Sequence, residues 1–295
     1  MRLFSQPETS GGGSDLPVFT FASDRPQRSR CFVPESMWHP AKLHLGLVQF
    51  LVDRYTRSGD TLCDPLAGSG SLLLAALSGR SVIARDIEER WVEVMGRNAD
   101  RIREQAGLFA GEIVVEQADA RQPWGITVDA VITSPPYGCE MSASPRAKKT
   151  LPYRLRDLPH DSKWDRYLNQ PTGGTAAMLT FHYGQHPAQI GTFRGRRYWE
   201  AMRMIYTQAH AAIREGGQLI LIVKDHIRDG QRVLTADRTI TLCQDIGFHL
   251  TDRFQRRVHP LSLWQRLRKE RGLPVVEEED VLVLRKGERV PEKPS

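Results

Sequence analysis

The fold is decided by the stretch Thr61-Leu62-Cys63-Asp64-Pro65-Leu66-Ala67-Gly68-Ser69-Gly70. Its first four residues predict a short strand that ends in a carboxylate, and a predicted helix at 71–77 follows the glycine-rich turn. Ligands of open α/β sheets bind at such strand ends, where glycine lets the backbone approach a nucleotide-like molecule. Two phosphate-binding loops are excluded, because no lysine follows Gly70 and Leu73 stands where a dinucleotide loop has its third glycine.

Strand and helix patterns alternate around this stretch from His39 onward, as a parallel α/β sheet requires. The strand at 218–223 is the most hydrophobic and is therefore predicted to be central. The predicted strands are 61–64, 81–84, 113–116, 129–132, 218–223, 248–258 and 281–284. The predicted helices are 43–55, 71–77, 88–105, 198–214 and 235–245. The pattern indicates an α/β, Rossmann-like fold with a mostly parallel seven-stranded sheet.

The periodicity is lost over 139–196, a stretch rich in proline, glycine, arginine and aromatic residues. A loop of this length without structure is uncommon in a compact domain, so we interpret it as an inserted lobe. The main domain is then predicted to comprise 39–138 and 197–295. Residues 1–38 are predicted to be an N-terminal extension, partly flexible because of its run of three glycines.

Two further carboxylates follow the next two predicted strands. Asp86 ends the strand at 81–84, where it can bridge two ribose hydroxyls, and Asp119 lies just beyond 113–116, where it can accept a hydrogen bond from an adenine amino group. Each acid alone is more often a surface or capping residue. Three acids at successive strand ends instead predict a nucleoside site without a phosphate-binding group.

The composition is that of a globular protein, with 40% hydrophobic and 26% charged residues and a net charge of +6. The positive charge is concentrated in 139–200 and 252–275, which favours a polyanionic partner, although two solvated basic loops would have the same composition. No apolar run reaches the ~20 residues of a membrane span, so no membrane partner is expected. The four cysteines form no Cys-x-x-Cys pair, so we expect no metal site, reduced thiols and a cytoplasmic location.

The turn Ser134-Pro135-Pro136-Tyr137 follows the predicted strand at 129–132. An exocyclic amine on a nucleic-acid base is a poor nucleophile, so a site must accept its protons and direct its nitrogen at the methyl donor. The Ser134 hydroxyl and the Pro135 carbonyl can accept the two amine hydrogens. Pro136 stiffens the turn, and Tyr137 offers a ring on which the base can stack. Ser-Pro-Pro-Tyr alone could also be an ordinary turn.

The two motifs together resemble those of the amino-methylating DNA methyltransferases, whose cofactor motif is typically Asp-Pro-Phe-Ala-Gly-Ser-Gly. His39-Pro40-Ala41-Lys42 is similar to their segment over the methionine end of the cofactor. The resemblance covers 39–137, and 198–286 more loosely. It implies a class I methyltransferase fold and S-adenosyl-L-methionine as cofactor. The implied cofactor-binding residues are His39, Lys42, Asp64, Pro65, Leu66, Ala67, Gly68, Ser69, Gly70, Asp86, Ile87, Asp119 and Ala120.

The resemblance also implies a substrate and catalytic residues. Ser134, Pro135, Pro136 and Tyr137 would catalyse site-specific methylation of double-stranded DNA after base flipping. Serine in the first motif position favours N4 of cytosine over N6 of adenine. The motif order, with the cofactor motif first, departs from the permuted order common among N4-cytosine enzymes. The inserted lobe would read the DNA sequence, a cognate restriction endonuclease is a possible partner, and the enzyme would be a monomer or homodimer.

Other classes of protein have motifs similar to these. A tRNA guanine-N2 methyltransferase would share the glycine turn and an Asn- or Asp-Pro-Pro-Tyr site, but the sequence offers no room for an added RNA-binding domain before His39. Ser134 argues against glutamine-modifying protein methyltransferases, which use Asn-Pro-Pro-Tyr. Carbon-5 methylation would need a cysteine nucleophile, and Cys139 follows the motif instead of lying within it. A nucleic-acid-binding module without activity is the remaining alternative.

Overall fold

The computed structural model describes residues 4–11, 16–39, 41–107, 110–136, 186–228, 231–258 and 263–287. Its main sheet has nine strands in the order β1-β2-β10-β11-β7-β6-β3-β4-β5. The strands are β1 (Glu8–Gly11), β2 (Pro17–Thr20), β3 (Thr61–Asp64), β4 (Ser81–Asp86), β5 (Ile113–Gln117), β6 (Val128–Thr133), β7 (Ile213–Val223), β10 (Phe248–Arg257) and β11 (Glu278–Lys286). A separate hairpin pairs β8 (His226–Arg228) with β9 (Gln231–Val233).

The five strands β5, β4, β3, β6 and β7 are parallel to one another. Numbered along the chain they have the order 3-2-1-4-5 of doubly wound nucleotide-binding sheets. β11 is antiparallel to both β7 and β10, and it completes seven strands. The predicted fold is therefore confirmed as a Rossmann-like class I methyltransferase fold, and β7 is central as predicted.

The N-terminal extension adds two strands that the sequence did not indicate. β2 pairs with β10 in parallel, and β1 pairs with β2. Phe19 of β2 lies with its ring centroid 5.1 Å from those of Phe50 and Phe254. The extension thus continues the sheet and packs on its core.

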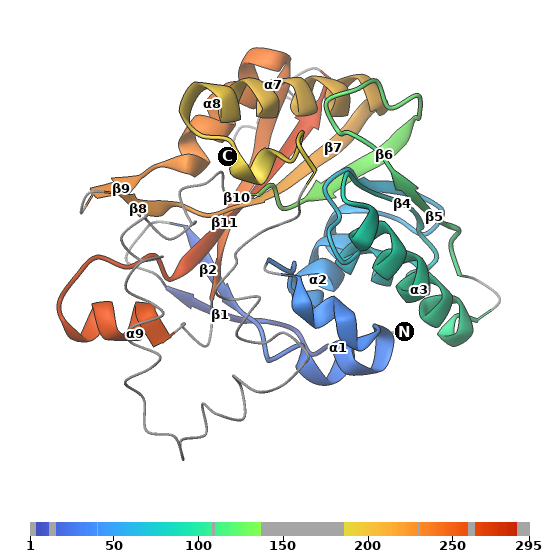
Figure 1. Ribbon diagram of the computed structural model, residues 1–295, viewed down its shortest axis with the longest axis horizontal. Coiled ribbons are helices and arrows are strands. Elements are labelled where there is room, and N and C mark those ends of the chain that lie inside the picture. The colour runs from blue at the N-terminus through green and yellow to red at the C-terminus, as the bar shows by residue number, and fades with distance from the viewer. Residues whose placement is uncertain are drawn as a thin grey trace, which may run out of the picture.

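Helices cover both faces of the sheet (Figure 1). α7 (Gly195–Ala212) and α8 (Thr235–Ile246) cover one face, and α2 (Leu45–Tyr55), the 3₁₀ helix η2 (Ser71–Ser78) and α3 (Glu89–Gln105) cover the other. The remaining helical segments are α1 (Arg25–Cys31), η1 (Pro34–Trp38), η4 (Ile190–Thr192) and α9 (Leu263–Glu270). Among the described residues, no helix is long and apolar enough to span a membrane.

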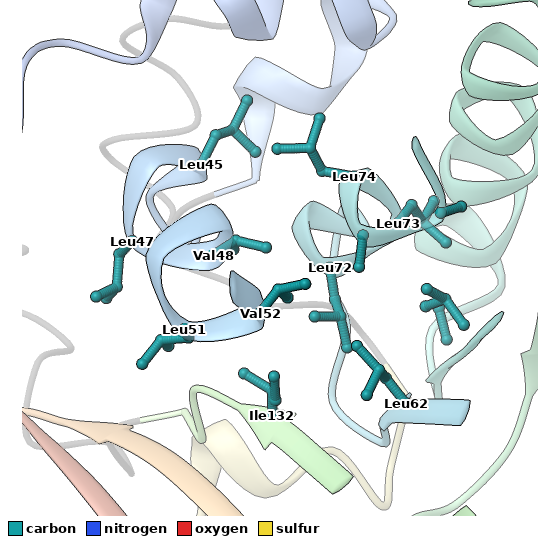
Figure 2. Close-up of a cluster of buried hydrophobic side chains, with 14 of the residues drawn as sticks. Leu45, Leu47, Val48, Leu51, Val52, Leu62, Leu72, Leu73, Leu74 and Ile132 are labelled. Carbon is teal, nitrogen blue, oxygen red and sulfur yellow. The ribbon is translucent and has the colours of Figure 1, made fainter. Parts of the chain in front are cut away.

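The core on the α2 side shows why the glycine turn is rigid. Leucines and valines of α2 interlock with three successive leucines of η2 and with Leu62 of β3 (Figure 2). Leu72 and Leu73 have no exposed surface. Because η2 is anchored in this way directly after Gly70, the turn before it has little freedom to move.

Candidate active site

The glycine turn joins β3 to η2 and brings three segments together. Gly68 and Gly70 have φ angles of +55° and +80°, in the left-handed region that favours glycine. The Gly68 N–H donates a hydrogen bond of 2.8 Å to Oδ2 of Asp86, at the end of β4. A Cβ on Gly68 would lie 2.5 Å from Nε2 of His39, so only glycine leaves room for that ring.

A cleft of about 740 Å³, including its open mouth, lies at the carboxyl ends of β3, β4, β5 and β6. Most of the predicted site residues line it, namely His39, Asp64, Pro65, Leu66, Ala67, Asp86, Ile87, Asp119, Ala120, Ser134 and Pro136. The structure therefore brings both motifs to one cleft.

Asp86 is held as an acceptor within this cleft. Its Oδ2 accepts from the Gly68 N–H, and its Oδ1 accepts from the Glu88 N–H at 2.9 Å. Burial raises the pKa of Asp86 to about 6, although both amide hydrogen bonds favour the charged form. The carboxylate is thus ionised at neutral pH, and a diol such as a ribose can donate to its remaining lone pairs.

Asp64 lies deeper, with 4% of its surface exposed. Its Oδ1 accepts a hydrogen bond of 3.1 Å from the Leu66 N–H. Burial raises the pKa of Asp64 to about 7, while the hydrogen bond from the Leu66 N–H opposes the shift. Burial therefore favours the protonated form of Asp64 far more than it would for an exposed carboxyl group.

Asp119 is engaged by a neighbouring arginine, which the sequence analysis did not anticipate. Arg121 donates to Oδ1 from Nε at 2.9 Å and to Oδ2 from Nη2 at 2.5 Å. Burial alone would raise the pKa of Asp119, but these bonds and the charge of Arg121 hold it below its usual value. The Arg121 backbone N–H also donates to Oδ1, at 3.0 Å, so Oδ2 is the oxygen that keeps a lone pair for an amino group in the cleft.

The segment that begins at His39 forms one wall of the cleft. The His39 ring lies edge-on to Trp91, with 4.6 Å between ring centroids, and burial lowers the pKa of His39 to about 3. Lys42 is not among the lining residues, because its Nζ donates to the carbonyls of His39 (2.6 Å) and Met37 (3.1 Å). Lys42 thus stabilises the wall instead of facing the cleft.

Four other predicted site residues act through the backbone or lie outside the described part. Ser69 is 2% exposed, and its carbonyl accepts from Asn98 Nδ2 at 2.8 Å. Gly70 shapes the turn, and Pro135 is buried between the lining residues Ser134 and Pro136. Tyr137 lies outside the described residues, as does most of the predicted inserted lobe.

Sequence reasoning missed several residues of the cleft. Trp91 was counted only as part of a helix, and the aromatic position on the inner face of α3 was its one signal. Ala188, Gln189 and Ile190 also line the cleft, and the His186 N–H bonds to Oε1 of Glu88 at 2.9 Å. These residues belong to a stretch without periodicity, which carries no signal of where it folds back.

The cleft fits S-adenosylmethionine on its own features. Asp86 provides an acceptor for a ribose, Gly68 keeps Cβ atoms away from the turn, and Ile87 and Ala120 offer apolar contact near Asp119 for an adenine. Ser134 directly follows β6, on the other side of β3 from Asp86, where a reacting amine can meet the methyl group.

Comparison with known proteins supports this cofactor. Residues 37–158 match the family described as RMKL-like, methyltransferase domain. The tRNA (guanine(10)-N2)-dimethyltransferase of Methanothermobacter thermautotrophicus is 30% identical over 165 residues, which are 55% of this chain and 44% of that protein. This chain therefore spans less than half the length of that relative.

Two solved structures are similar to the chain at low identity. TrmN from Thermus thermophilus is 18% identical with a TM-score of 0.45, and the match covers 86% of this chain and 52% of that one. Magnesium protoporphyrin IX methyltransferase from Synechocystis PCC 6803, with bound S-adenosylhomocysteine, is 14% identical with a TM-score of 0.46 over 82% and 80% of the two chains.

The fold, the cleft and the matched domain are those of an S-adenosylmethionine-dependent methyltransferase. The predicted membership of the DNA amino-methyltransferases is wrong, because the sequence matches are to the RMKL-like domain and to a tRNA-modifying enzyme. The predictions of double-stranded DNA and a restriction endonuclease as partners, and of N4 of cytosine or N6 of adenine in DNA as target, are wrong for the same reason. The physical reason is that the glycine turn and Ser134-Pro135-Pro136 are suited to a cofactor and an amine, and neither motif contains a group that distinguishes DNA from RNA.

Proposed function

We propose that this chain transfers a methyl group from S-adenosylmethionine to the exocyclic N2 amine of a guanine in tRNA. The observation that carries the reaction is the placement of Ser134 and Pro136 in the same cleft as Asp86. The substrate is inferred from the relative that modifies N2 of a tRNA guanine and is 30% identical over 165 residues. The position of the target within tRNA is not carried over.

The turn that follows β6, Ser134-Pro135-Pro136, can bind such an amine and make its nitrogen more nucleophilic. The Ser134 hydroxyl and the Pro135 carbonyl accept the two N2 hydrogens, which holds the amine and raises electron density on nitrogen. When bound, the cofactor supplies an electrophilic methyl group on its sulfonium sulfur. Ser134 and Pro135 would hold the amine nitrogen toward that methyl group, and the proton that the amine gives up on methylation would leave to water through the hydrogen bond to the Ser134 hydroxyl. Asp86 fixes the nucleoside part of the site throughout.

Serine in the first motif position is compatible with guanine as well as with cytosine. Cytosine, adenine and guanine all present an exocyclic amine with two hydrogens, and a hydroxyl accepts one of them equally from each base. Ser134 therefore provides amine chemistry without choosing the base. A paired guanine in a tRNA stem would have to leave the stack to reach the cleft.

The test is to incubate the protein with labelled S-adenosylmethionine and total tRNA, with duplex DNA in parallel, and to digest each to nucleosides. We expect label in N2-methylguanosine or N2,N2-dimethylguanosine from tRNA. Ser134→Ala should lower the rate about 100-fold with S-adenosylhomocysteine binding unchanged, whereas Ser58→Ala, at an exposed position away from the cleft, should not. Label in another nucleoside, or in DNA alone, would contradict the proposal.

A further inference from the structure

A row of polar side chains crosses the carboxyl edge of the sheet beyond the cofactor cleft. Alternate residues of a strand face the same side. The last core residues on the α2 side of four neighbouring strands belong to one cluster, Ile132, Ile222, Val281 and Phe254. The next residues toward this edge on the same face are therefore Ser134 after β6, Lys224 after β7, Glu279 of β11 and Arg256 of β10.

Within this row, Lys224 is the neighbour of Ser134 on the adjacent strand. Leu221 of β7 is the register partner of Thr133, so Ser134 stands opposite Ile222, and Lys224 is one pleat further along the adjacent strand. Diagonal neighbours of this kind have Cα atoms about 7–8 Å apart, within reach of a lysine side chain. Asp225 takes the other face, where its Oδ1 accepts from the Ala236 N–H at 3.2 Å.

The two carboxylates whose charges act on Lys224, Glu279 and Glu278, are already engaged by arginines. Glu279 pairs with Arg256 at 2.7 Å, and Glu278 pairs with Arg257 at 3.3 Å. Burial lowers the pKa of Lys224, which the charge of Glu279 opposes. A partly buried ammonium without a carboxylate at contact distance among the described residues is costly, and an acceptor on a bound molecule would offset that cost.

A target base must approach Ser134 from the Lys224 side. The other side of Ser134 is the cofactor cleft, bounded by Asp64 and Asp86 of the next two strands. Methyl transfer requires the nucleophilic nitrogen to lie between the methyl group and the rest of the base. The base therefore extends over the end of β7, where Lys224 stands.

We propose that Lys224 donates a hydrogen bond to O6 of the target guanine and so admits guanine while rejecting adenine. This inference rests on the proposed function. With N2 of guanine at Ser134, O6 lies at the far end of the same base edge, about one strand spacing of ~4.8 Å away. Adenine presents no carbonyl on the edge that carries its amine. Lys224 is thus a specificity-determining residue beside the acceptors of the amine.

The test uses tRNA transcripts that carry guanine or 2-aminopurine at the methylated position. 2-Aminopurine keeps the amine but lacks O6. The wild-type kcat/KM should favour guanine about 10- to 100-fold, as expected for one hydrogen bond to a charged group. Lys224→Met should lose this factor on guanine only, so that the two substrates become nearly equal. Lys224→Arg should retain part of the preference, since it restores a cationic donor.

The controls separate the possible failures. Lys269→Met removes a lysine that pairs with Glu277 on the surface, and it should keep the wild-type preference. S-adenosylhomocysteine affinity should be the same in all variants, which verifies that they are folded; Lys224→Gln replaces Lys224→Met if the latter does not fold. An unchanged preference in the Lys224 variants would overturn the role of Lys224 and leave the proposed function intact. No guanine-N2 methylation by the wild type would overturn both.

Discussion

Gly68 is confined by its own backbone and by the ring of His39. Its φ of +55° costs any other residue about 1–2 kcal/mol, and a Cβ would lie 2.5 Å from His39 Nε2. We therefore expect Gly68→Ala to displace the His39 wall and to weaken S-adenosylhomocysteine binding at least about 10-fold in calorimetry, equivalent to ~1.4 kcal/mol.

Gly125→Ala separates the two effects. Gly125 has a similar φ of +61° but no atom within 4 Å of its added Cβ. This variant should show the backbone strain as a lower melting temperature and leave cofactor affinity unchanged. Equal loss of affinity in both variants would mean that His39 does not depend on the turn.

Asp64 should make the stability of the ligand-free protein depend on pH. Its pKa is about 7 in the folded protein because of burial, above the 3.8 of an unperturbed group. The folded state therefore binds the proton more tightly, so this contribution is fully present below pH 4 and is lost as the pH rises toward 7. Each pKa unit corresponds to about 1.4 kcal/mol.

Asp64→Asn removes the free-energy cost of holding a buried charged carboxylate at high pH. It keeps a side-chain oxygen that can accept from the Leu66 N–H. In urea unfolding, the variant should gain stability relative to the wild type between pH 5 and pH 8. Asp100→Asn, at an exposed site on α3, should show no such trend. If the free energy of unfolding of Asp64→Asn differed from that of the wild type by the same amount at pH 5 and pH 8, the raised pKa of Asp64 would be refuted.

The positions of single site residues were predictable from the sequence where a residue lies at the end of a predicted strand. Asp86 and Ser134 end or follow strands, and the parallel sheet brings strand ends to one edge, so both were expected in the cleft, where they lie. The partners of Lys42 and Asp119 were not predictable. They depend on where a nearby side chain or carbonyl turns, which no periodicity encodes.

The strands β3, β4, β5 and β6 were predictable because each contains a short apolar run bounded by turn or helix signals. β3 has the bounds expected from its sequence, and β4, β5 and β6 differ only by one or two residues at their ends. β1 and β2 were missed because each has four residues and neither shows a clear alternation. Short strands of this kind are specified by the neighbour on which they pack.

The dependence of β2 on its neighbours can be measured at Phe19. Phe19→Ala removes ring contacts with Phe50 and Phe254, and we expect a loss of about 2–3 kcal/mol in the free energy of unfolding, less than for a fully buried ring. Met204→Ala, at a position 47% exposed on α7, should change stability by no more than about 0.5 kcal/mol. A negligible effect of Phe19→Ala would show that the N-terminal strands do not contribute to the stability of the core.

At the scale of the whole molecule, the reaction was predictable and the polymer was not. The motifs specify a cofactor and an amine, and segregated positive charge specifies a polyanion, but DNA and RNA share both the amines and the phosphates. The features that distinguish RNA are its 2′-hydroxyls and shape, and these are read by surfaces with no short motif. The proposal of tRNA in place of DNA therefore rests on a relative whose name gives a tRNA guanine as its substrate.

Binding of a polyanion implies a salt dependence that cofactor binding should not share. If about three phosphates are neutralised, a fourfold rise in KCl should lower kcat/KM for tRNA about 20-fold or more. Affinity for S-adenosylhomocysteine, which has no phosphate, should hardly change over the same range. A tRNA rate that is insensitive to salt would exclude a largely electrostatic tRNA interface.

The charges that cause this dependence should lie on the cleft side of the sheet. Arg196 and Arg197 are exposed at the start of α7, shortly after the lining residues Gln189 and Ile190. The guanidinium carbon of Arg197 lies 3.8 Å from the centroid of the Phe193 ring. Because Phe193 is buried, this contact fixes the position of the Arg197 side chain. Replacing Arg196 and Arg197 by alanine should raise the KM for tRNA several-fold and flatten its salt dependence, since fewer counterions are released. Arg57→Ala, at the opposite edge beside the start of β3, should leave both unchanged, and an equal effect of the two substitutions would place the tRNA elsewhere.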